Sequence, residues 1–118
     1  MKSLPDLSNL INLSELRLDI LPKLMEIQGL GKLESLMSLN ISLCKSLERL
    51  PNVSNLGILK ELKLYKCQKL AKIEGLGVLK SLETLDVRWC TSLEIPDLSN
   101  LKNLKKPRTC DCKNLTEI

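Results

Sequence analysis

Residues 51–73, PNVSNLGILKELKLYKCQKLAKI, contain the pattern that decides the fold. Aliphatic residues recur at every third position over most of this segment and at every second position in the stretch LKL at 62–64. Alternation of apolar and polar residues is typical of a short strand with one buried face. The segment therefore predicts one strand, followed and preceded by chain whose apolar residues cover the buried side of that strand.

The same pattern occurs five times along the chain. Cys44, Cys67 and Cys90 follow one another at intervals of 23 residues, and Cys112 follows after 22. Aligned on these cysteines, the segments share the template L-x-x-L-x-x-L-x-L-x-x-C-x-x-L-x-x-I/L. The five segments are 5–27, 28–50, 51–73, 74–95 and 96–118.

This template resembles that of leucine-rich repeats. No segment of this size can bury its apolar face alone, so successive segments must stack on one another. We predict a single α/β leucine-rich-repeat solenoid over 1–118, with short parallel β-strands on the concave face and short helical turns or irregular chain on the convex face. The last repeat is degenerate, because Pro107 and Thr109 replace its two strand leucines, and we expect the strand around 106–110 to be short or absent. Neither end of the chain has a polar capping segment, so we expect a fragment of a longer solenoid.

The composition excludes several classes of function. The net charge of +4 comes from 18 basic and 14 acidic residues that are spread along the chain, which argues against nucleic acid and anionic membranes as partners. No stretch approaches the roughly 18 apolar residues of a membrane helix. The chain has no histidine, no clustered pair of carboxylates and no nucleophile beside a base. We therefore expect neither an enzyme nor a site for a metal or cofactor.

The cysteines are interpreted as parts of the core. Residues that repeat one strand apart form a line and do not converge on a point, as the ligands of a tetrahedral metal site must. We expect Cys44, Cys67, Cys90 and Cys112 to be buried free thiols. Cys110 falls on an outward strand position and is the candidate for a reactive thiol.

Two longer phrases extend the resemblance to a protein family. LKELKLYKCQKLAKIEGLG at 59–77 and LETLDVRWCTSLEIPDLSNLKNLK at 82–105 closely resemble the C-terminal repeats of plant intracellular nucleotide-binding leucine-rich-repeat immune receptors, and most of all the Toll/interleukin-1-receptor-domain branch. The resemblance covers nearly the whole chain. It implies a cytoplasmic, non-catalytic module of the defence response that recognises proteins and helps to hold the receptor inactive. The implied partner is a pathogen effector, a host protein or the receptor's own nucleotide-binding module, and the oligomeric state is left open.

The outward positions of the third and fourth strands hold the candidate site. Tyr65 and Trp89 are the only aromatic residues of the chain, and Arg88 lies beside Trp89. Such residues are enriched at the centres of protein interfaces. Asp86 is expected to lie between Lys63 and Arg108 in an ordinary ladder of surface charges. The predicted protein-contact residues are Glu61, Lys63, Tyr65, Thr84, Asp86, Arg88 and Trp89.

Two other interpretations stay open at this level. The same solenoid could serve as a generic intracellular scaffold or inhibitor. It could also be a truncated receptor product without an independent function, because the ends are irregular and the last strand is broken.

Overall fold

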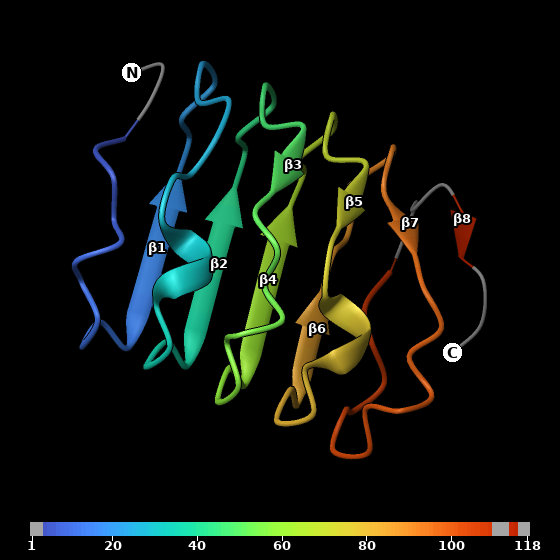
Figure 1. The fold of residues 1–118 in the computed structure, drawn as a ribbon. Coiled ribbons are helices and arrows are strands. Elements are labelled where there is room, and N and C mark those ends of the chain that lie inside the picture. Colours follow the sequence, from blue (N-terminus) through green and yellow to red (C-terminus); the bar gives the residue numbers. More distant parts are fainter. Residues whose placement is uncertain (1–3, 110–113, 116–118) are drawn as a thin grey trace.

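The computed structural model describes residues 4–109 and the backbone of 114–115. Its main feature is a parallel sheet of four strands in the order β1-β2-β4-β6, with successive segments of the chain adding one strand each (Figure 1). The strands are Glu15–Asp19 (β1), Ser38–Ser42 (β2), Glu61–Tyr65 (β4) and Thr84–Asp86 (β6).

The register of the sheet confirms the 23-residue period. Leu39 pairs with Leu62, and Leu62 pairs with Leu85, so equivalent residues of successive segments lie side by side. The chain is therefore a parallel-stranded β-solenoid. We call the five segments coils one to five, and the outward side of the β1-β2-β4-β6 sheet the strand-bearing face.

The core is a continuous aliphatic stack that runs from Leu7 to Leu101. In coil three, every one of the eight apolar template positions is at most 3 % exposed. These positions are Val53, Leu56, Leu59, Leu62, Leu64, Cys67, Leu70 and Ile73. Burial of such side chains contributes about 1.5–3 kcal/mol each, and it is possible only because the coils on both sides cover them.

The return path combines irregular chain with short regular elements. Two single-turn 3-10 helices, Leu30–Lys32 (η1) and Leu76–Val78 (η2), lie in front of the sheet in Figure 1, and the described residues contain no α-helix. The helical turns agree with the prediction for this side. A second row of very short strands was not predicted. They are Arg49–Leu50 (β3), Lys72–Ile73 (β5), Glu94–Ile95 (β7) and Asn114–Leu115 (β8), which pair as β3-β5 and β7-β8.

Coil five departs from the regular sheet, as its sequence predicts. Between residues 106 and 109, Arg108 forms only an isolated bridge with Asp86. The backbone N–H of Arg108 donates to the Leu85 carbonyl at 2.9 Å, and the Val87 N–H donates to the Arg108 carbonyl at 2.8 Å. Neighbouring residues of a strand direct their N–H groups to opposite sides, so the missing N–H of the buried Pro107 would face away from coil four. Proline is therefore tolerated there, at an edge.

Coils one to four each leave the sheet through a residue with left-handed backbone. Ile20, Leu43, Lys66 and Trp89 have φ angles of 56°, 57°, 55° and 59°. In this conformation the N–H of Leu43, for example, still donates to the Tyr65 carbonyl of the next coil at 2.8 Å. The bend then turns the chain inward, and the following cysteine column enters the core. We call these four residues the strand-end row.

No helix among the described residues has the length and the apolar character required to cross a membrane.

Candidate functional site

The structure places the seven predicted contact residues on two neighbouring coils. Five lie in strands, with Glu61, Lys63 and Tyr65 on β4 and Thr84 and Asp86 on β6. The register pairs Glu61 with Thr84 and Lys63 with Asp86. The other two, Arg88 and Trp89, lie in the turn that follows β6. The sequence predicted that strand to continue further, but β6 ends at Asp86 because coil five provides only the single bridge at Arg108.

The two aromatic rings form the centre of the site. Tyr65 and Trp89 meet edge to face, with ring centroids 5.5 Å apart and ring planes at 86°. The Arg88 guanidinium carbon lies 5.9 Å from the Tyr65 centroid and 5.7 Å from the Trp89 centroid. Lys66 Nζ lies 5.5 Å from the Tyr65 centroid. All four side chains are half-buried, and we call them the Tyr65–Trp89 cluster.

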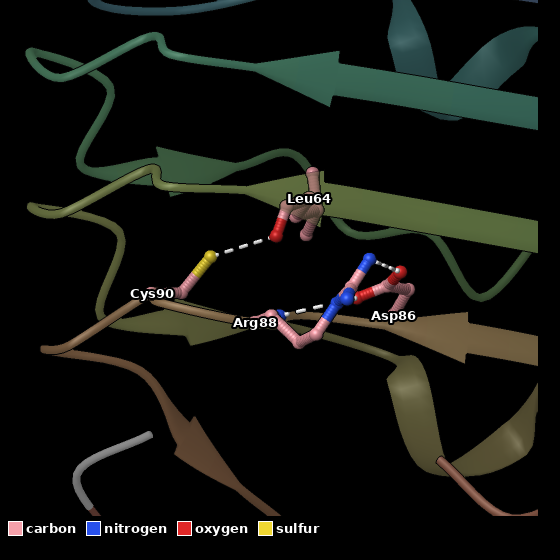
Figure 2. Close-up of polar contacts among 4 residues, drawn as sticks. All are labelled: Leu64, Asp86, Arg88 and Cys90. Carbon is pink, nitrogen blue, oxygen red and sulfur yellow. Dashed lines mark hydrogen bonds and ion pairs between the residues drawn. The ribbon is translucent and has the colours of Figure 1, made fainter. Parts of the chain in front are cut away.

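Asp86 lies between Lys63 and Arg108 in the register, as predicted, but it is not the exposed surface charge that was expected. The residue is 9 % exposed. Its carboxylate accepts hydrogen bonds from Arg88 Nε at 2.9 Å and from Arg88 Nη2 at 3.0 Å (Figure 2). The backbone N–H of Arg88 also donates to Asp86 Oδ1 at 3.3 Å. Arg88 is therefore held in place by its own coil.

The contact of Asp86 with Arg88 follows from their spacing along the chain. Residues two apart on an extended segment point to the same side, so an Asp and an Arg at this spacing can meet without a neighbouring strand. The same arrangement occurs in coil one, where Arg17 Nε donates to Asp19 Oδ2 at 3.0 Å. Opposite charges at i and i+2 were the sequence signal that would have identified both pairs.

The strand-end row contributes apolar residues that the predicted site left out. Ile20 is 65 % exposed and Leu43 is 39 % exposed, although both are large and aliphatic. They lie in the same row as Trp89, at the C-terminal ends of β1 and β2. The usable signal was an apolar residue at the position directly before the cysteine column, where the template needs none.

The cysteine column lies beneath this site and is buried as predicted. Cys44, Cys67 and Cys90 are free thiols with no exposed surface. The Cys90 thiol donates to the Leu64 carbonyl at 2.9 Å, which ties coil four to coil three (Figure 2). Burial raises the pKa of the Cys44 thiol, because desolvation disfavours its thiolate form. Cys110 and Cys112 lie outside the described residues.

The described residues include no cluster of three or more His, Cys, Asp or Glu side chains that could hold a metal ion. A hollow of about 680 Å³ opens on the return-path side, away from the Tyr65–Trp89 cluster. Its lining combines acidic and basic side chains, among them Glu48, Arg49, Lys69 and Lys72. The cluster itself combines a guanidinium, an ammonium and two aromatic rings, and Tyr, Trp and Arg are residue types enriched in protein interfaces.

No protein-family model matches the chain, and no curated protein matches it either.

Proposed function

We propose that the chain is a leucine-rich-repeat solenoid whose strand-bearing face recognises another protein without catalysing a reaction. The observation that carries this proposal is the Tyr65–Trp89 cluster. It brings the only two aromatic residues of the chain together with Arg88 on neighbouring coils. Tyr, Trp and Arg are the residues that most often dominate the energy of protein interfaces.

Preorganisation supports the same proposal. The buried Asp86 carboxylate fixes the Arg88 guanidinium through two hydrogen bonds, and each aromatic ring limits the movement of the other. A partner that contacts these side chains therefore loses less conformational entropy than it would on a surface of free rotamers.

The resemblance to plant immune receptors supports the biological context that we propose. In this context the chain is a cytoplasmic part of a disease-resistance receptor. Its partner is a pathogen effector, a host protein or the receptor's own nucleotide-binding module.

The proposal is tested by selecting short random peptides displayed on phage against the whole chain. The affinity of each selected peptide is then measured for wild type, Trp89→Ala, Tyr65→Ala and the control Val78→Ala. Val78 is 57 % exposed and lies on the return path in η2, so its truncation should leave binding unchanged. Truncation of either ring should weaken binding about 30-fold, since a hot-spot residue contributes about 2 kcal/mol.

Circular dichroism of each variant separates loss of contact from loss of folding. Wild-type affinity in a folded Trp89→Ala chain would contradict the proposal, because the contact would then lie elsewhere.

A further inference from the structure

The charge on the strand-bearing face indicates what kind of protein segment fits it. We infer that the site receives an extended acidic segment, whose carboxylates contact coils three to five while its apolar side chains contact the strand-end row. This inference rests on the proposed function and specifies the chemistry of the partner.

Basic residues outnumber acidic ones on this part of the face. The acidic residues are Glu61 and Asp86. The basic residues on and beside the last strands are Lys63, Lys66, Arg88, Lys106 and Arg108.

The two acidic groups offset only part of this positive charge. Asp86 pairs with Arg88, and Glu61 keeps its negative charge while it accepts a hydrogen bond from the Ser38 hydroxyl at 3.3 Å. Among residues 4–109, Lys63, Lys66, Lys106 and Arg108 take part in no ion pair. Four cations thus remain available to an incoming anionic group on coils three to five.

Coils one and two have a different character. Arg17 is paired with Asp19, and Glu15 adds a further acidic group, so this half of the face offers no surplus of positive charge. It offers Ile20 and Leu43 instead, both exposed at the ends of their strands. The strand-bearing face therefore offers apolar side chains on coils one and two and positive charge on coils three to five. Trp89 lies among the basic residues of coil four and belongs to the same strand-end row as Ile20 and Leu43.

This combination favours a peptide over a nucleic acid. A nucleic-acid backbone would leave the exposed Ile20 and Leu43 side chains without apolar contacts, whereas a peptide can match both parts. Strands are about 4.8 Å apart, so three intervals from coil one to coil four span about 14 Å, or about four residues of extended chain at 3.3 Å each. A short segment that mixes leucine and glutamate is long enough to reach from Leu43 to the basic residues.

The test uses Trp89, the only tryptophan of the chain, as the fluorescent probe. The whole chain is titrated with a synthetic peptide of alternating Glu and Leu, with the same peptide carrying Gln in place of Glu, and with the same peptide carrying Lys. We expect only the Glu peptide to change the Trp89 emission with saturation. Its dissociation constant should rise at least about tenfold on going from 0.1 M to 1 M salt, as the screening length falls from about 10 Å to about 3 Å.

Charge-reversal variants locate the contact. Lys63→Glu and Arg108→Glu should each weaken binding of the Glu peptide several-fold. Lys69→Glu is the matched control, because it makes the same charge change in coil three on the return-path side and should leave affinity unchanged.

Three results would overturn the inference. The Gln or Lys peptide could bind as tightly as the Glu peptide, or Lys69→Glu could weaken binding as much as Lys63→Glu and Arg108→Glu do. A single-stranded oligonucleotide could also bind more tightly than the Glu peptide. These results are distinguishable from a failure of the proposed function. If display selection still yields peptides whose binding depends on Trp89, protein recognition stands and only the acidic class is wrong.

Discussion

Within residues 4–109, four residues other than glycine hold left-handed backbone at the strand ends, and this is the main strain at the scale of single residues. An L-residue in this region costs roughly 1–2 kcal/mol, and a β-branched residue such as Ile20 fits it least well. The bend is nevertheless kept in four successive coils, because it joins the sheet to the inward turn of the cysteine column while the backbone stays hydrogen-bonded. The identity of each side chain in this row is therefore set by the surface and not by the core.

Replacing Ile20 with Asn should stabilise the chain by about 1 kcal/mol. Asn adopts left-handed backbone readily, and the 65 % exposed Ile20 side chain contributes little to the core. Equilibrium unfolding in urea measures the change. Ile58→Asn is the control, because Ile58 is also exposed but has ordinary backbone, and it should bring no gain. A loss of stability in Ile20→Asn would show that Ile20 packs against the coil more than its exposure indicates.

Acid sensitivity is a second property of single residues. The Ser8 N–H donates to Asp6 Oδ1, and the Ser99 N–H donates to Asp97 Oδ1, both at 2.9 Å. These backbone hydrogen bonds lower the pKa of both carboxyls below the ordinary 3.8. A carboxyl whose pKa is lowered by folding contributes stability above the pKa of the unfolded chain, and this contribution is lost as the pH falls through the folded value.

The double variant Asp6→Asn, Asp97→Asn should therefore lose less stability than wild type when the pH falls from 7 to below 3.8. The turns should survive at pH 7, because Asn52 accepts the same hydrogen bond from the Ser54 N–H at 2.9 Å. Urea midpoints at both pH values measure the difference. Identical acid dependence in the variant and wild type would mean that other carboxyls govern acid unfolding.

The contacts between coils explain why odd and even segments open differently. Gly29 has φ 86°, and a Cβ at this position would clash with Asp6 Oδ1 and the Ser8 nitrogen of the preceding coil. Gly75 lies in the same way against the turn of Asn52 and Ser54. The turns that open coils one and three thus pack beneath the glycines of coils two and four. The alternation of PDLSNL or PNVSNL with QGLGKL or EGLGVL is a consequence of this packing.

Gly29→Ala should destabilise the chain by about 2 kcal/mol or more, because the left-handed backbone and the clash act together. Gly57→Ala is the matched control. A Cβ on Gly57 meets nothing within 4 Å, and its φ is not positive, so the change should be small. Thermal unfolding of both variants measures the difference. Equal melting temperatures would disprove the proposed packing of turn against glycine.

At the scale of the whole molecule, the five coils form a stack with a radius of gyration of 13.1 Å, close to the roughly 13 Å expected for a compact domain of this length. The candidate site exists only at this scale. Tyr65 and Lys66 come from coil three, while Arg88 and Trp89 come from coil four, so no single coil contains the cluster. Its position also depends on coil five, whose single bridge at Arg108 shortens β6 and leaves Arg88 and Trp89 in a turn.

The sequence by itself determined the repeat length, the apolar columns and the sides to which strand residues point. These follow from local periodicity, which each coil repeats and which the register of Leu39, Leu62 and Leu85 confirms. The two-residue strands on the return path were beyond prediction from sequence, because elements so short have no periodicity and arise only when equivalent coils stack.

Only the tertiary structure decided how the charged and aromatic side chains combine. Asp86 had three basic residues within reach of its expected position. The i, i+2 spacing marks Arg88 as one candidate, but only the structure shows that the carboxylate pairs with Arg88 and with neither Lys63 nor Arg108. The edge-to-face contact of Tyr65 with Trp89 likewise depends on a backbone bend at Trp89. The sequence gives no sign of this bend, because tryptophan does not favour left-handed backbone. Periodicity fixes which side of the chain a residue faces, whereas its partner depends on the distances between neighbouring coils, and these exist only once the coils have stacked.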